Sequence, residues 1–205
     1  MTDRTLELAR RLHALARTGL HFCRDEYDRE RYAEIERIAA GLLAGPGEPV
    51  NARLLEAWAR EDGYVTPKVE VRGAAFRDGR VLMVREAADG LWTLPGGWAD
   101  VNESPSQAVE KEFVQESGLQ VRAVKLAALY DRNRHAHGAF LFHSWKAFFL
   151  CEILGGEPRG SYETEAVGFF DPGELPPLSL GRCTPAQVQR MRRHWQDRAL
   201  PADFD

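Results

Sequence analysis

The segment from residue 104 to residue 118 concentrates carboxylates that could bind a metal ion. Glu112 and Glu116 are four positions apart, so a helix would place both side chains on one face, and Gln115 would share that face. Like charges at this spacing repel each other, and a Mg²⁺ or Mn²⁺ ion would turn the repulsion into shared oxygen ligation. A solvated surface face is the alternative for an isolated pair of glutamates, so the neighbouring elements decide between the two interpretations.

The sequence marks both ends of this helix and a loop before it. Ser104 at the cap, Pro105 at the first helical position and Gln107 three residues after the cap form a capping box. Gly118 is placed to end the helix. Just upstream, the glycines of Pro95–Gly97 let the backbone pass close to a ligand and expose its carbonyl oxygens. Loop and helix together resemble a site for a diphosphate or a triphosphate.

The 23 residues from Gly97 to Leu119 resemble the Nudix box, G-x5-E-x7-R-E-U-x-E-E-x-G-U, in which U is apolar. Seven of the nine specified positions agree, and Glu103 supplies the first glutamate. The departures are Lys111 in place of arginine and Gln115 in place of the first glutamate of the E-E pair. Lysine keeps the charge and loses the bidentate geometry of arginine. Glutamine keeps a ligating oxygen and loses a negative charge, so we expect weaker cation binding.

The resemblance implies a metal-dependent hydrolase that cleaves a pyrophosphate linked to a nucleoside. It implies that Glu112 and Glu116 bind Mg²⁺ or Mn²⁺ and that Gln115 is a weakened ligand. A carbonyl oxygen of Gly96 or Gly97 would add a further ligand. The water that attacks phosphorus would be polarised by the metal ion, and Glu112 is also a candidate catalytic residue.

Four more residues complete the site that the resemblance implies. Glu103 and Lys111 would support the loop and the helix. One further acidic residue often assists as a ligand or a base, and the candidates are Glu163 and Glu165 in the segment SYETEAVGFF. An exposed loop glutamate without a role in catalysis is the alternative for either one.

The N-terminal third of the chain has a helical pattern. Apolar residues recur at helical spacing from Leu6 to Leu43 and predict two amphipathic helices. Asn51 is placed to cap a third, short helix through Leu54, Leu55 and Trp58. These helices predict a small all-helical domain over residues 1–62, and the wider family resemblance given below implies that this domain takes part in dimerisation.

Strand patterns begin after residue 67. Asp78 and Gly79 predict a tight hairpin turn between strands 69–76 and 81–84. The mixture with helices indicates an α+β fold, and the resemblance specifies a Nudix α/β/α sandwich with a mixed sheet over residues 67–205. Further strands are predicted at residues 121–130, 145–150 and 166–170, and a last helix at residues 185–195.

The resemblance extends over nearly the whole chain to bacterial Nudix proteins with a helical N-terminal domain. The segments YDRERYAEIERIAAGLL and DGYVTPKVEVRGAAF carry it outside the box. Members of that group are associated with hydrolysis of CDP-choline to CMP and phosphocholine and with homodimers. We therefore expect CDP-choline as the substrate, with ADP-ribose or a nucleoside triphosphate as alternatives. A regulatory protein that binds a nucleotide without cleaving it is the contrasting class, and Gln115 is the one feature that favours it.

Four residues are candidates for binding the substrate. Trp98 and Tyr130 could stack on a base, although aromatic residues near strands more often belong to the core. Arg72 and Arg132 could bind phosphate, although such arginines are more often solvated charges.

The composition limits the class of partner. The formal net charge of -4 gives no general attraction for nucleic acid. A basic edge on the last helix, with Arg190, Arg192, Arg193 and His194, could bind RNA, but a solvated face is the preferred interpretation. Three dispersed cysteines fit neither a disulfide framework nor a zinc site, and no segment has the composition of a membrane span. We expect a cytoplasmic protein.

Overall fold

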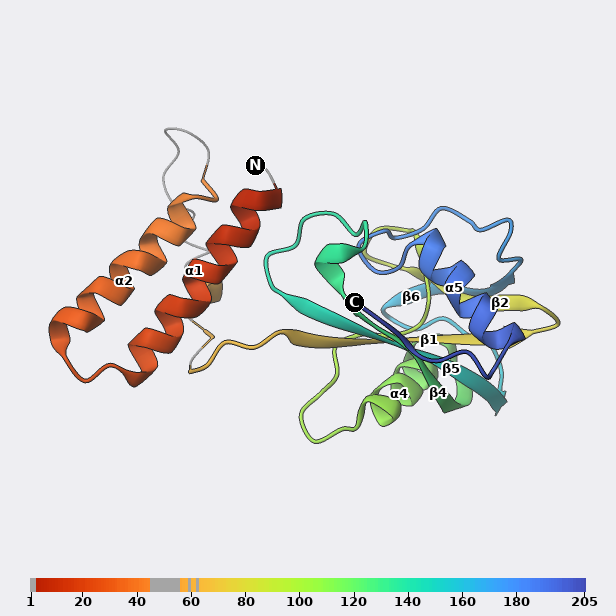
Figure 1. The fold of residues 1–205 in the computed structure, drawn as a ribbon. Coiled ribbons are helices and arrows are strands. Elements are labelled where there is room, and N and C mark those ends of the chain that lie inside the picture. The colour runs from red at the N-terminus through yellow and green to blue at the C-terminus, as the bar shows by residue number, and fades with distance from the viewer. Residues whose placement is uncertain (1–2, 45–55, 59, 62) are drawn as a thin grey trace. The chain divides into compact units, whose positions relative to one another are not determined.

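The computed structural model describes residues 3–44, 56–58, 60, 61 and 63–205. The chain divides into two compact units (Figure 1). The first unit comprises Met1–Pro67 together with Ala139–His143, and the second comprises Lys68–Gly138 and Ser144–Asp205. No pattern in the sequence predicted that Ala139–His143 belongs to the helical unit.

The first unit is built on two helices, α1 (Asp3–Phe22) and α2 (Glu26–Gly41), which pack side by side as a helical hairpin (Figure 1). The apolar periodicity predicted both helices. Asp25 caps α2 because its side chain accepts the Asp28 N–H. The core of the unit joins small residues of both helices to Trp58, and Leu141 and Phe142 pack against it. Leu54 and Leu55 of the predicted third helix lie outside the described residues, whereas Trp58 is helical and 1% exposed.

The second unit is a mixed sheet with a helix on each face, which confirms the predicted α+β fold (Figure 1). The strand order is β3-β2-β1-β5-β4-β7, and β6 pairs with β2. Strand β1 runs parallel to β5 and antiparallel to β2. The elements are β1 (Lys68–Arg77), β2 (Arg80–Glu86), β3 (Trp92–Thr93), α4 (Pro105–Ser117), β4 (Leu119–Asp131), η1 (Arg132–Arg134), β5 (Ser144–Gly156), β6 (Thr164–Phe170), α5 (Pro185–Gln196) and β7 (Asp203–Phe204).

Alternation along the central strands creates two hydrophobic cores. On one face, Val71 and Leu82 pack with Phe113 of α4. On the other face, Ala74 and Met83 pack with residues of α5 that include Met191. Because neighbouring side chains of a strand point to opposite faces and both faces are covered, β1 is buried on both sides from Glu70 to Ala75, and this buried stretch includes two charged residues, Glu70 and Arg72. Strand β1 is thus paired on both edges, with β2 on one side and β5 on the other.

The hairpin between β1 and β2 has the predicted turn. Asp78 and Gly79 have φ angles of 52° and 77°, which are the positive values that a two-residue hairpin turn requires. Phe76 pairs with Val81 and Arg77 pairs with Arg80 across the turn.

Helix α5 uses part of its basic edge within the protein. Arg190 pairs with Asp203 of β7, and His194 is fully buried with Nε2 3.2 Å from the same carboxylate. These contacts hold the C-terminal strand against the sheet, and they leave fewer cations for an RNA than the sequence alone indicated.

Candidate active site

Helix α4 begins and ends as the sequence predicted. The Ser104 side chain accepts the Gln107 N–H, and the Gln107 side chain accepts the Ser104 N–H in return. Gly118 ends the helix with a φ angle of 72°. Within the helix Glu116 is 4% exposed, whereas Gln115 is exposed. Gln115 and Glu116, which occupy the E-E pair of the box, therefore differ in environment, because Gln115 faces solvent and Glu116 faces the protein interior.

The loop Pro95–Gly97 lies along strand β1 and is fixed to it by backbone hydrogen bonds. Gly73 donates to Pro95 O over 2.9 Å and Val71 donates to Gly97 O over 2.8 Å. Gly96 has a φ angle of 145°, and a Cβ atom at this position would lie 2.0 Å from Val71 O. Only glycine can therefore bring the loop this close to the strand.

The same loop contacts both glutamates that were predicted to bind the metal ion. The Gly96 N–H donates to Glu116 Oε2 over 2.8 Å. A Cβ atom on Gly97 would lie 2.7 Å from Glu112 Oε1. The structure thus brings Glu112, Glu116 and the two glycines together.

Burial of these carboxylates makes their negative charge costly. Burial raises the pKa of Glu116 to about 8, against the opposing effects of the Arg72 guanidinium and the Gly96 N–H. The charges of Glu112 and Glu86 raise this pKa further. Burial likewise raises the pKa of Glu112, and Arg72 and Lys111 oppose it. A cation beside these oxygens would stabilise their ionised forms.

Lys111 joins the loop to the helix. Its Nζ lies 2.7 Å from Glu103 Oε2 and 2.7 Å from Asp100 Oδ2. The hydrogen bond to Asp100 raises the pKa of Lys111 the most, and the hydrogen bond to Glu103 raises it further, so the amine stays charged. The contacts fit the supporting role expected of Glu103 and Lys111, and they add Asp100, which the sequence did not single out.

Of the two acids outside the box, the structure brings only Glu163 to the cluster. The negative charge of Glu163 raises the pKa values of Glu112 and Glu86. Its neighbour Glu165 lies on β6, and its Oε2 is 3.1 Å from Arg85 Nη2. This ion pair engages the Glu165 carboxylate, so we retain Glu163 as the candidate.

Glu86 and Arg182 are members of the cluster that the sequence did not reveal. Glu86 ends β2 and is 7% exposed, and its Oε1 lies 3.0 Å from Arg182 Nε. Burial raises the pKa of Glu86, and Arg182 and Arg72 oppose this effect. The only signal in the sequence was an acid at the end of the apolar run VLMVRE.

The donor set suits a hard divalent cation. Among the described residues, no three histidine, cysteine, aspartate or glutamate side chains form a ready-made metal site. Mg²⁺ is commonly held by one or two carboxylates together with water and substrate phosphates, and this pattern needs no third acidic ligand. Glu112, Glu116 and a glycine carbonyl of the loop can supply such oxygens.

The two arginines predicted to bind phosphate are both buried. Arg72 is 4% exposed and donates to Glu70 Oε1 over 2.7 Å and to Leu94 O over 2.9 Å. Arg132 is 5% exposed and donates to Gly138 O over 2.9 Å. Neither is the solvated charge that we considered as the alternative. These contacts favour positioning of the protein itself, and phosphate binding by either arginine stays a prediction.

The two aromatic candidates differ in exposure. Tyr130 is 8% exposed, belongs to the core beneath α5, and donates to Asp203 Oδ2 over 3.0 Å. Trp98 is 44% exposed next to the Pro95–Gly97 loop. Base stacking by the partly exposed Trp98 stays a prediction, whereas the contacts of Tyr130 favour the core interpretation.

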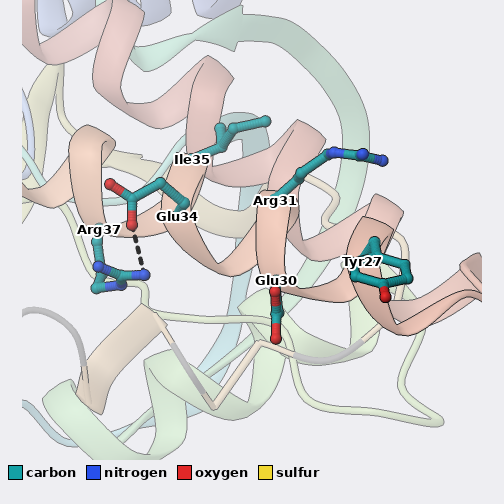
Figure 2. Close-up of a pocket in the computed structure, with 6 residues that line it drawn as sticks. All are labelled: Tyr27, Glu30, Arg31, Glu34, Ile35 and Arg37. Atoms are coloured by element: carbon teal, nitrogen blue, oxygen red, sulfur yellow. Dashed lines mark ion pairs between the residues drawn. The ribbon is translucent and has the colours of Figure 1, made fainter.

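A separate hollow of about 650 Å³ lies on the helical unit (Figure 2). The described residues that line it all come from α2, and they include an ion pair between Arg37 and Glu34. None of the predicted site residues lines it. We therefore place the chemistry at the carboxylate cluster of the second unit. The lining residues are Tyr27, Glu30, Arg31, Glu34, Ile35 and Arg37.

Comparison with protein families agrees with this assignment. Residues 67–192 match the model of the NUDIX domain. The chain belongs to the Nudix family. Residues 3–49 match a second model, described as a UDP-X-like, N-terminal oligomerisation domain. This Nudix chain is therefore a pyrophosphohydrolase, as the box predicted, and its helical unit carries an oligomerisation domain.

Several relatives of this Nudix chain have assigned activities. YjhB of Bacillus subtilis (strain 168), to which ADP-ribose pyrophosphatase activity is attributed, is 40% identical over 186 residues, which are 91% of this chain and 89% of that protein. The crystal structure of an ADP-ribose pyrophosphatase from Streptococcus suis 89-1591 has a TM-score of 0.64 at 39% identity and covers 68% of this chain and 100% of its own. The crystal structure of a UDP-X diphosphatase has a TM-score of 0.65 at 28% identity and covers 99% and 98% of the two chains.

These similarities assign this Nudix chain to hydrolases of nucleoside diphosphates that are linked to another moiety. They do not extend to the predicted preference for CDP-choline. Within the described part of the chain, no helix has the length and apolar character to cross a membrane.

Proposed function

We propose that the chain hydrolyses ADP-ribose or a closely similar nucleoside diphosphate sugar, using Mg²⁺ or Mn²⁺. The observation that carries the proposal is the meeting of Glu112 and Glu116 at the Pro95–Gly97 loop, beside Glu163. The attribution of ADP-ribose pyrophosphatase activity to two relatives near 40% identity supports this substrate over CDP-choline.

Each residue of the cluster has a distinct task in this proposal. Glu112 and Glu116 would hold the cation through carboxylate oxygens. Gly97 O already accepts the Val71 N–H, so we favour Gly96 O as the backbone ligand. Gln115 is exposed and would add a neutral oxygen. When bound, the metal ion polarises water and neutralises phosphate charge.

Glu163 is the residue that we propose as the general base. It belongs to the segment before β6, on a different element from α4, and its backbone is fixed because the Ala87 N–H donates to Glu163 O over 2.8 Å. A carboxylate near the ligands can accept the proton that water loses when its oxygen attacks phosphorus. The bond to the leaving phosphate then breaks, which yields two phosphate monoesters.

CDP-choline remains the second candidate, because the sequence resemblance covers the helical domain as well as the box. Purified protein would be offered ADP-ribose, CDP-choline, a UDP-sugar, NADH and nucleoside triphosphates, with Mg²⁺ and then Mn²⁺, and products would be identified by mass. We expect AMP and ribose 5-phosphate from ADP-ribose as the dominant reaction. Faster release of CMP from CDP-choline would overturn the preferred substrate. Tight binding without turnover of any of them would favour the regulatory alternative.

We also propose that the helical domain predicted over residues 1–62 forms a homodimer. Leu8, Leu15 and Phe22 recur every seven residues along α1 and are 41%, 59% and 66% exposed. Such a stripe fits a second copy of itself, and the matching family model describes an oligomerisation domain. Leu15→Glu should give a monomer in analytical ultracentrifugation. Leu154→Glu replaces a leucine of the second unit that is 61% exposed and should leave the dimer intact.

A further inference from the structure

A buried lysine lies at the junction of two segments that border the active site. Lys146 on β5 is fully buried, and its Nζ donates to Glu70 Oε1 over 2.6 Å and to Arg182 O over 2.7 Å. The parallel pairing of β1 with β5 sets this contact, because Glu70 and Lys146 are direct partners in the register. A lysine buried this completely needs ionic and hydrogen-bonding partners, which these two acceptors supply.

From Glu70 the contacts continue to the metal-binding loop. The same Oε1 atom of Glu70 accepts Arg72 Nε over 2.7 Å, and Arg72 Nη1 donates to Leu94 O over 2.9 Å. Leu94 precedes the Pro95–Gly97 loop, whose Gly96 N–H binds Glu116. The chain of contacts thus runs from β5 through β1 to the carboxylate of α4, and it crosses three elements that are distant in the sequence.

A second branch of contacts starts at the same lysine. The Arg182 carbonyl accepts Lys146 Nζ, while the Arg182 side chain lies 3.0 Å from Glu86 Oε1 and 3.1 Å from Asp89 Oδ2. Lys146 therefore fixes the backbone from which Arg182 reaches the buried Glu86. Lys146 thus contacts both the branch through Glu70 that leads to Glu116 and the branch through Arg182 that leads to Glu86.

We propose that Lys146, Glu70 and Arg72 are positioning residues that fix the Pro95–Gly97 loop and Glu116 for binding of a divalent cation. The inference rests on the proposed function of this site. It assigns to Arg72 a role other than the predicted binding of substrate phosphate. Residues that orient metal ligands without touching the metal typically change metal affinity by about 10- to 100-fold when they are replaced.

The charges point to orientation as the reason for this network. Replacement of buried ion pairs by apolar residues of similar volume is often neutral or stabilising, so bulk stability alone does not require three charged residues in the core. Arg72 also provides the positive charge that opposes the rise in the pKa values of Glu112 and Glu116. The planar guanidinium of Arg72 donates to Leu94 O and to Glu70 in a fixed relative geometry, which the ammonium group of a lysine cannot impose.

The test compares direct Mn²⁺ binding by wild-type protein, Lys146→Met and Arg72→Lys, measured from the loss of the free Mn²⁺ signal in electron paramagnetic resonance. We expect the Mn²⁺ dissociation constant to rise about tenfold or more in Lys146→Met. The Mg²⁺ concentration for half-maximal hydrolysis should rise in parallel. Arg72→Lys keeps the charge and loses the fork, so it should also bind Mn²⁺ more weakly even if Lys146→Met fails to fold.

Lys125→Met is the matched control. Lys125 also donates to two acceptors, Arg198 O over 3.0 Å and Leu200 O over 2.5 Å, but these hold the C-terminal segment. The control should keep wild-type Mn²⁺ affinity. Folded Lys146→Met and Arg72→Lys proteins with wild-type Mn²⁺ affinity would overturn the proposal. Wild-type protein that binds Mn²⁺ without hydrolysing any substrate would refute the proposed function while leaving the positioning roles testable.

Discussion

The backbone N–H of Gly96 donates to Glu116 Oε2 over 2.8 Å, which links the glycine loop to the helix of the Nudix box. Glu116 lies buried at this contact, and its pKa is raised to about 8. One carboxylate oxygen thus orients the loop, while the other is available to a cation.

Glu116→Gln should abolish hydrolysis without unfolding the protein. Glutamine has nearly the same volume as glutamate and keeps an oxygen that can accept the Gly96 N–H, but it removes the charge that a cation needs. We expect the rate to fall by about 100-fold or more, beyond the loss typical of residues that only support a ligand. Circular dichroism and turnover with ADP-ribose would be measured together, and unchanged turnover would refute the metal assignment.

Gln115→Glu should lower the metal concentration that the enzyme requires. The substitution restores a negative charge at an exposed position next to Glu116. A unit charge about 4 Å from a cation near the protein surface contributes roughly 1 kcal/mol or more, which corresponds to a severalfold lower half-saturating Mg²⁺ concentration. Titration of activity with Mg²⁺ measures this directly. An identical titration curve would mean that residue 115 does not contact the ion.

Glu163→Gln and Glu165→Gln should separate the two acids outside the box. Loss of a general base typically costs about 100-fold or more in rate, so we expect this loss in Glu163→Gln. Glu165 pairs with Arg85, and its replacement should leave the rate near that of the wild type. Turnover rates at saturating Mg²⁺ provide the comparison. The reverse order of effects would transfer the assignment to Glu165.

Gly96→Ala should be far more damaging than Gly79→Ala, although both glycines have positive φ angles of 145° and 77°. A Cβ atom at Gly79 meets nothing within 4 Å, whereas at Gly96 it would lie 2.0 Å from Val71 O. We expect about 1 to 2 kcal/mol of lost stability for Gly79→Ala and about 3 kcal/mol or more for Gly96→Ala. Urea denaturation measures both. Equal losses would show that the loop can move away from β1 at little cost.

Stability without a divalent cation should depend on the protonation of Glu116. Its folded pKa of about 8 lies above the ordinary value of 4.5, so protonated Glu116 contributes stability that is complete below about pH 4.5 and is lost as the pH rises through about 8. In EDTA, the free energy of unfolding of the wild type should therefore fall relative to Glu116→Gln from about pH 5 to about pH 9, by an amount on the order of a few kcal/mol.

Denaturant titrations of both proteins across this pH range measure the difference in unfolding free energy. Added Mn²⁺ should restore stability to the wild type at high pH and should release protons when it binds near pH 7. A pH-independent difference between the two proteins would mean that Glu116 is ionised throughout the range.

The sequence by itself determined the local parts of this protein. The spacing of the box placed Glu112 and Glu116 on one helix, and Ser104, Gln107 and Gly118 predicted its ends, because capping and helical periodicity act over a few neighbouring residues. The turn at Asp78 and Gly79 was predictable for the same reason. The substrate was not, since a box specifies the phosphate chemistry and leaves the rest of the ligand open.

Tertiary structure decided which charges surround the box. Glu70 meets Lys146 only because β1 and β5, 76 positions apart in the sequence, pair in a particular register. The same pairing buries Arg72, which the sequence alone could present only as a candidate for phosphate binding. The choice of Glu163 over Glu165 and the membership of Glu86 depended in the same way on how β6 lies against β2. A register that shifts by one residue reverses the face of every side chain, so these contacts follow from strand pairing and not from local residue type.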